Sequence, residues 1–105
     1  SGHSTFSRAG AETLAAFTGS PYFPGGLGEF VAPLNSYLVF EDGPSVEVRL
    51  QWASYYDAAD QAGQSRIFGG IHIWPDDSVG RQLGSVVGQD AVARARTYFE
   101  GTAAP

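Results

Sequence analysis

Three glycines at a spacing of four, Gly80, Gly84 and Gly88, lie inside the longest helix-forming segment of the chain. This segment runs from about residue 76 to about residue 100. Its larger apolar side chains recur at helical spacing: Val79, Leu83, Val86, Val87, Ala91, Ala95 and Tyr98. Each glycine costs about 1 kcal/mol relative to alanine inside a helix. Three glycines along one ridge therefore predict that a second helix packs unusually close to this one.

Two shorter helices are predicted upstream of that segment. Residues 4–17 place their larger apolar side chains at helical spacing, and a breaker sequence of Thr-Gly-Ser-Pro follows them. An alanine-rich stretch at 51–64 carries its aromatic residues on one side and is expected to form a helix that ends just before Ser65 and Arg66. The chain thus has three predicted helices.

A β-hairpin is predicted between the first two helices. Residues 38–40 and 46–50 are rich in strand-forming side chains and flank a turn with the sequence Glu-Asp-Gly-Pro. Residues 21–33 combine glycines and prolines with large apolar side chains, which is typical of an ordered, packed loop. The predicted fold class is mainly α, a helical bundle with a small β-hairpin excursion.

Length and charge limit the classes of partner. The chain has 105 residues, enough for one small domain or for part of one. Its six basic residues are all arginines and its formal net charge is -5, so it has no basic cluster to bind nucleic acid or an anionic membrane. The absence of cysteine leaves the compartment undetermined. No apolar run approaches the roughly 18 residues that span a bilayer, so we expect a soluble chain, with secretion or a periplasmic location both compatible.

The first three residues, Ser1, Gly2 and His3, form a candidate anion-binding segment in front of the first predicted helix. Backbone N–H groups at a helix N-terminus favour an anion, and a serine hydroxyl adds a donor. The imidazole of His3 can act as acid and base around neutral pH. The alternative is an ordinary helix cap followed by a surface histidine.

Arg66 offers a permanently charged, rigid fork that suits two oxygens of a tetrahedral oxyanion. The alternative is an ion pair on the helix surface with Asp57 or Asp60.

His72 follows two glycines and precedes a tryptophan and a proline, so its backbone is constrained while its ring can face a pocket. It is a candidate metal ligand or nucleophile, and the alternative is a core histidine with satisfied hydrogen bonds. Asp76 can orient an imidazole through its second nitrogen, or it can cap the last helix. Asp77 is the competing acid next to it.

Taken together, Ser-Gly-His at 1–3 and Ser-Arg-x5-His-x3-Asp at 65–76 resemble two of the three signature motifs of one enzyme superfamily. This superfamily contains the type 2 phosphatidic acid phosphatases and the vanadium-dependent haloperoxidases. Its third motif, Lys-x6-Arg-Pro, lies upstream of Ser-Gly-His, and this chain has no lysine. The resemblance implies that residues 1–105 are the C-terminal part of a single vanadium haloperoxidase-like catalytic domain, with the helical bundle of haloperoxidases and acid phosphatases.

The resemblance implies a vanadate cofactor, or a phosphate bound in the same site. His72 would coordinate vanadium, while Ser1, the Gly2 N–H and Arg66 would bind the oxygens. His3 would move a proton as hydrogen peroxide enters and a halide is oxidised. The missing lysine and arginine would come from an upstream part of the same domain or from another chain.

Two other readings use the same residues. In a phosphomonoesterase, His72 would attack phosphorus to give a phosphohistidine, His3 would protonate the leaving alcohol and Asp76 would orient His72. In the third reading the chain is an inactive fragment or a binding module, because removal of fixed positive charge weakens the binding of a multiply charged anion.

Overall fold

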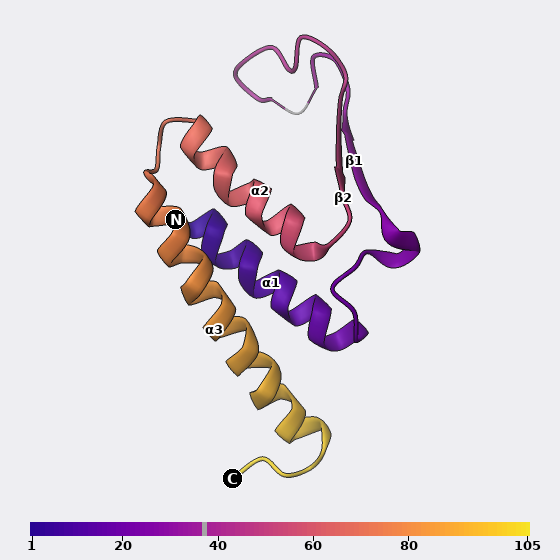
Figure 1. Ribbon diagram of the computed structural model, residues 1–105, viewed down its shortest axis with the longest axis vertical. Coiled ribbons are helices and arrows are strands. Elements are labelled where there is room, and N and C mark those ends of the chain that lie inside the picture. The colour runs from indigo at the N-terminus through magenta and orange to yellow at the C-terminus, as the bar shows by residue number, and fades with distance from the viewer. Residues whose placement is uncertain (37) are drawn as a thin grey trace.

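The computed structural model describes residues 1–36 and 38–105 of the chain. In these residues three α-helices, one short 3-10 helix and a two-stranded sheet follow one another. Their order is α1 (Gly2–Thr18), η1 (Pro24–Gly26), β1 (Gly28–Ala32), β2 (Val48–Trp52), α2 (Tyr55–Phe68) and α3 (Trp74–Phe99). In Figure 1, α1 lies between α2 and α3, and the hairpin extends away from the helices beside α2. The predicted mainly α class with a small hairpin is confirmed.

The glycine ridge of α3 faces α1, as its spacing predicts. A β-carbon built on Gly88 would lie 2.8 Å from the carbonyl oxygen of Ala9, and one built on Gly84 would collide with the carbonyl oxygen of Thr5. Gly80, Gly84 and Gly88 are buried. The two helices therefore approach until backbone meets backbone, an approach that larger residues at these positions would prevent.

The apolar stripe of α3 does not enter this contact. Val79, Leu83, Val86 and Val87 remain between 48% and 59% exposed. The buried face of α3 consists of glycines and Asp77 instead. The helix thus buries its narrow ridge and leaves its larger apolar side chains at the surface.

The second helix begins four residues later than its alanine content predicts. Ser54 is the N-cap: its hydroxyl accepts from the Asp57 N–H (3.1 Å), and the Asp57 carboxylate accepts from the Ser54 N–H (3.0 Å). This reciprocal pair starts the helix at Tyr55. The prediction of a helix from Gln51 is wrong because the strand alternation continues through Trp52 before the cap. At its other end the helix runs to Phe68, so it includes the Ser-Arg motif.

The hairpin pairs a different first strand from the predicted one. β1 and β2 are antiparallel, with Phe30 opposite Leu50 and Glu29 opposite Gln51. The Glu29 carboxylate accepts across the sheet from Arg49 (2.8 Å) and from Gln51 (2.6 Å). These cross-strand pairs select residues 28–32, which the sequence suggested as part of a loop.

The predicted strand at 38–40 is wrong. Among these residues Phe40 is 98% exposed, and none is paired in the sheet. The backbone N–H of Asn35 donates to the Pro44 carbonyl (3.1 Å) within the loop that connects β1 to β2. The second strand is shifted as well, to Val48–Trp52, because it must match β1 residue by residue.

The apolar core is small and lies where α1 meets α2. Its buried members are Ala11, Tyr55 and Ala59, with Phe23 packed against Tyr55 at a ring separation of 4.8 Å. The radius of gyration is 16.4 Å, against about 13 Å for a compact chain of 100 residues. In the described ranges, every helix is either too short or too polar to cross a membrane.

Candidate functional site

The two motifs of the sequence meet at one end of the helical bundle. The N-terminus of α1, the C-terminal end of α2 and the N-terminal end of α3 lie together there (Figure 1). The backbone nitrogen of Ser1 donates to the carbonyl oxygen of Asp76 at 2.9 Å. Residues 75 positions apart in the sequence are thus in direct contact.

Ser1 is the N-cap of α1. Its hydroxyl oxygen accepts from the Ser4 N–H at 3.4 Å, and its carbonyl accepts from the Thr5 N–H at 3.0 Å. The capping alternative is therefore realised, but the hydroxyl keeps its own proton for donation to a further acceptor. Gly2 and His3 are exposed in the first turn. This helix end can offer a hydroxyl and a free imidazole to an anion.

His72 is held by Asp76. Its Nδ1 lies 3.0 Å from Asp76 Oδ2, and the same carboxylate oxygen accepts from the Ile73 N–H at 3.4 Å. The hydrogen bond from His72, followed by that from Ile73, holds the pKa of Asp76 below its usual value. A carboxylate on Nδ1 favours the tautomer that carries its proton there and leaves Nε2 with a lone pair. The ring is thus prepared to bind or attack through Nε2.

The neighbouring acid has a different environment. Asp77 is only 2% exposed, and its carboxylate accepts from the Ser4 hydroxyl (2.7 Å) and from Arg81 (2.7 Å and 3.0 Å). Burial alone would raise the pKa of Asp77, but the hydrogen bonds from Arg81 and Ser4 lower it. Of the two acids, Asp76 therefore contacts the histidine and Asp77 ties helices together.

Arg66 lies in the last turn of α2, and its Nε is buried without a hydrogen-bond partner in residues 1–36 and 38–105. The expected alternative, an ion pair with Asp57 or Asp60, is not formed in those residues. Asp57 caps α2, and Asp60 pairs with arginines of the other two helices. A buried N–H without an acceptor costs about 1–3 kcal/mol, so this guanidinium suits an anion that would supply the acceptor.

A short turn connects Arg66 to His72. The Ile71 N–H donates to the carbonyl oxygen of Arg66 at 3.2 Å, and Gly70 adopts a positive φ of 74°. Glycine is favoured at this φ because a β-carbon would strain the backbone. The turn brings the backbone just before His72 back to the C-terminal end of α2. A backbone hydrogen bond therefore fixes the chain between Arg66 and His72.

The family of the chain follows from a comparison of sequences. The family model of the VCPO second helical-bundle domain matches residues 1–101, which is nearly the whole chain. The chain belongs to this vanadium haloperoxidase-like family. Searches of the curated proteins and of the solved structures found no significant match. The family match covers the helical bundle, and the roles of individual site residues remain predictions.

The candidate site combines one imidazole with hydrogen-bond donors from two helices. The described part of this haloperoxidase-family chain has no group of three or more His, Asp or Glu side chains able to hold a metal ion. It does have a histidine with Nε2 available, a capping hydroxyl and an arginine with an unpaired N–H. The hydroxyl and the arginine N–H can donate hydrogen bonds to the oxygens of an anion, whereas Nε2 offers a lone pair.

A network of buried and partly buried polar side chains was not predicted from the sequence. Beyond Asp77, the carboxylate of Glu12 accepts from Ser85 (2.7 Å) and from Tyr56 (2.8 Å), and so links all three helices. The spacing of four between Asp77 and Arg81 is visible in the sequence as a helical ion pair. Their partners on the other helices are not visible, because they depend on how the helices pack.

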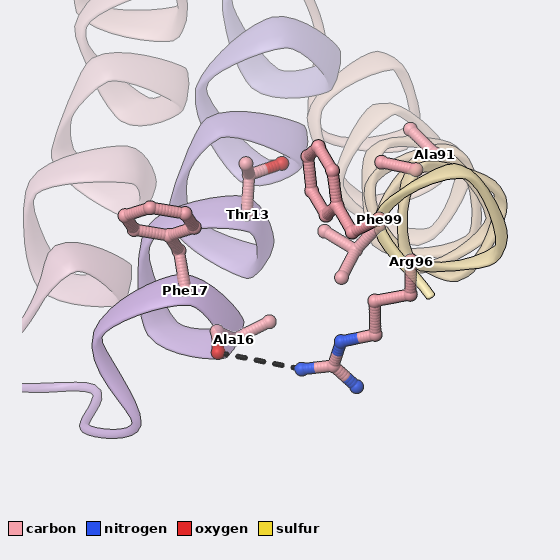
Figure 2. A pocket seen from close by; sticks show the side chains of 8 residues that line it. Thr13, Ala16, Phe17, Ala91, Arg96 and Phe99 are labelled. Carbon is pink, nitrogen blue, oxygen red and sulfur yellow. Dashed lines mark hydrogen bonds between the residues drawn. The ribbon is translucent and has the colours of Figure 1, made fainter. Parts of the chain in front are cut away.

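The apolar groove in Figure 2 lies away from the candidate site. Its volume is about 460 Å³, and it is lined by the C-terminal halves of α1 and α3: Thr13, Ala16, Phe17, Ala91, Val92, Ala95, Arg96 and Phe99. Arg96 donates from its rim to the Ala16 carbonyl at 3.5 Å. At about 1.5 Å per helical residue, Ala16 is roughly 20 Å along α1 from His3. The groove therefore contributes nothing to the chemistry of the histidines.

Proposed function

We propose that this chain supplies the histidine half of a vanadate site in a vanadium-dependent haloperoxidase. The observation that carries the proposal is the His72–Asp76 hydrogen bond of 3.0 Å, located where Ser1 contacts Asp76 through the backbone. An isolated surface histidine would need neither the carboxylate nor the nearby helix N-terminus. The guanidinium of Arg66 adds a fixed positive charge, and in the described residues its Nε–H has no hydrogen-bond acceptor.

In this proposal the binding residues have separate tasks. His72 binds vanadium through Nε2, and Asp76 keeps the ring in the correct tautomer by holding Nδ1. Arg66, the Ser1 hydroxyl and the Gly2 N–H bind the oxygens and offset their negative charge. Bound vanadate supplies a Lewis acid at which hydrogen peroxide is activated to oxidise a halide.

His3 is the proposed proton carrier. It is exposed in the first turn of α1, one residue before the buried Ser4. Its backbone is held in the helix, and among residues 1–36 and 38–105 no hydrogen bond occupies its ring nitrogens. In this position it would accept a proton as hydrogen peroxide binds and would later give that proton up, a task that suits an imidazole near neutral pH.

The site needs further positive charge from outside this chain. Of the five arginines other than Arg66, Arg8, Arg49 and Arg81 form ion pairs. Arg8 and Arg81 both contact Asp60. We propose that a segment bearing lysine and arginine completes the anion site. This segment belongs to an upstream part of the same domain or to another chain.

A phosphomonoesterase is the competing function, and the same His72–Asp76 geometry favours it. An imidazole with Nδ1 bound to a carboxylate has its Nε2 lone pair free to attack phosphorus. His3 would then protonate the leaving alcohol. The two enzymes differ in their reactions and not in these side chains, so assays must separate them.

The test uses the protein that contains this chain together with the segment that completes its site. Halide-dependent peroxidase turnover is measured with orthovanadate and hydrogen peroxide, beside hydrolysis of a phosphate ester. Turnover that requires both vanadate and halide supports the haloperoxidase. Phosphate release that vanadate inhibits assigns the phosphatase instead, and the absence of both activities in the complete protein overturns both proposals.

A further inference from the structure

A buried hydrogen bond joins the two segments of the candidate site, the N-terminus of α1 and the N-terminal end of α3. It is formed by the residues that directly follow His3 and Asp76. The hydroxyl of Ser4 donates to Asp77 Oδ1 at 2.7 Å, and these residues are 0% and 2% exposed. Ser4 directly follows His3, and Asp77 directly follows Asp76. A shift of this bond would therefore move the proton-transfer segment relative to the His72–Asp76 pair.

Arg81 of α3 also binds the Asp77 carboxylate and connects it to α2. Its Nε and Nη2 both donate to the Asp77 carboxylate, at 3.0 Å and 2.7 Å, in a two-pronged arrangement with defined geometry. Its guanidinium also donates to the Asp60 carbonyl at 3.4 Å, and its Nη1 lies 3.3 Å from Asp60 Oδ1. The carboxylate of Asp77 thus links α3 directly to α1 through Ser4, and indirectly to α2 through Arg81.

Gly63 makes room for this link on α2. A β-carbon at Gly63 would collide with Asp77 Oδ1 and would lie 2.9 Å from the Ser4 hydroxyl. The backbone of α2 therefore covers the hydrogen bond directly and keeps water from it. Arg66 lies three residues further along the same helix. The distance between Gly63 and the Ser4–Asp77 pair therefore also affects where the Arg66 guanidinium lies.

A second carboxylate bridge offers a matched comparison further from the site. Glu12 on α1 accepts from Ser85 on α3 (2.7 Å) and from Tyr56 on α2 (2.8 Å), and Arg8 also contacts it. Both bridges centre on one carboxylate: Glu12 contacts the two other helices directly, whereas Asp77 reaches α2 through Arg81. Because Glu12 lies eight residues beyond Ser4 on α1, about 12 Å away at 1.5 Å per residue, it supports the same helices without adjoining the site.

We propose that Asp77, acting with Ser4 and Arg81, is a positioning residue that sets the distance between His3 and the His72–Asp76 pair. It does not touch the anion. Its effect on the reaction passes through the helix ends that it holds together. This inference rests on the proposed function, because it assigns both histidines to one site.

The test compares Asp77→Asn with Glu12→Gln in the complete protein. Each variant keeps the shape of its side chain and removes one charge from a three-helix bridge, so both lower the free energy of unfolding. Asp77→Asn should weaken orthovanadate affinity and lower peroxidase kcat by about tenfold or more, since small misplacements in a site are costly. Glu12→Gln should change both quantities less than about twofold, the level expected where site geometry is unchanged.

A milder pair guards against loss of folding. Ser4→Ala removes one hydrogen bond from Asp77 and leaves Arg81 in place, while Ser85→Ala removes one from Glu12 and leaves Tyr56. The imidazole NMR signals of His3 and His72 are recorded without vanadate. They should shift together in Ser4→Ala and stay in place in Ser85→Ala.

Equal effects of the near and far variants, or unchanged histidine signals in Ser4→Ala, would overturn the positioning role. A wild-type protein that binds no orthovanadate and turns over no substrate would instead refute the proposed function. The NMR comparison still decides the positioning role in that case, because it needs no bound anion.

Discussion

Two adjacent aspartates show how strongly the environment of a residue decides its role. Asp76 lies on the exposed side of α3 and holds the ring of His72, whereas Asp77 is one step around the helix and is buried among three helices. Successive residues on a helix point about 100° apart, so neighbours in sequence face different surroundings. The spacing of the motif favoured Asp76, and the geometry gives the physical reason for that choice.

At the residue scale, the two histidines should fail in different ways. His72→Ala should abolish orthovanadate binding because it removes the only proposed vanadium ligand. His3→Ala should leave binding within a few-fold and remove peroxidase turnover, because it removes proton transfer. Calorimetry with orthovanadate and a halide-dependent assay on the same samples measure both effects. Tight vanadate binding by His72→Ala would refute the ligand assignment.

Asp77 should also make folding sensitive to acid. Its hydrogen bonds hold its folded pKa below the unfolded value, so its contribution to stability is complete above the unfolded pKa and falls as the pH drops below about 4. The free energy of unfolding should therefore fall less on acidification in Asp77→Asn than in the wild type. Denaturant unfolding at several pH values measures this difference.

The control for this measurement is Asp90→Asn, at an exposed position of α3. It should follow the pH dependence of the wild type. An Asp77→Asn protein with the same acid sensitivity as the wild type would contradict the assigned role of its hydrogen bonds.

At the scale of elements, the contact between α1 and α3 depends on the absence of side chains. A helix with three central glycines is intrinsically weak, since each lowers helix stability by about 1 kcal/mol. Here close packing against α1 offsets this loss of helix stability. Gly80 lies against Ser4, and Gly88 lies against Ala9. The packing of the pair, and not the propensity of either helix, holds this element in place.

Two glycine substitutions should therefore change the free energy of unfolding in opposite directions. Gly84→Ala should lower the free energy of unfolding by about 1–3 kcal/mol, because its β-carbon would collide with the Thr5 carbonyl oxygen. Gly10→Ala in α1 should raise it by up to about 1 kcal/mol, because nothing lies within 4 Å of the new methyl group. Urea unfolding of the two variants measures both changes, and stabilisation by Gly84→Ala would show that the helices are further apart.

At the scale of the whole molecule, the chain buries little of its apolar surface. Several large side chains are nearly fully exposed, among them Phe6 (80%), Phe17 (83%), Phe68 (84%) and Phe99 (78%). Apolar surface of this extent is typical of interaction faces or of surfaces prone to aggregation. The core of Ala11, Tyr55 and Ala59 is small for a chain of 105 residues.

We therefore expect the isolated chain to be weakly stable and to associate in solution. Size-exclusion chromatography with light scattering should show species larger than the 11.1 kDa monomer, and unfolding should begin at low urea concentration. The complete protein, with the segment that supplies lysine and arginine, should unfold at higher urea. This expectation would be contradicted if the isolated chain were a monomer with a free energy of unfolding of about 5 kcal/mol or more, which is usual for stable domains.

The hairpin marks the limit of what local sequence could predict. Residues 38–40 have strand-forming side chains, yet residues 28–32 form the first strand, because only they place Glu29 opposite Gln51 and beside Arg49. Strand propensity describes how well a residue fits a half-buried surface, and the partner strand defines that surface. The start of α2 differs from the prediction although its Ser54–Asp57 cap is local, because β2 continues through Trp52.

The sequence by itself determined the helical class, the close contact along the glycine ridge and the set of candidate site residues. These follow from periodicity, glycine spacing and motif spacing, which are local properties of the chain. Only the tertiary structure decided which acid faces His72, that Ser1 contacts Asp76, and that Ser4, Asp77 and Arg81 form one buried link. The Ser1–Asp76 and Ser4–Asp77 contacts join residues 75 and 73 positions apart, so they exist only once the helices have packed in one arrangement.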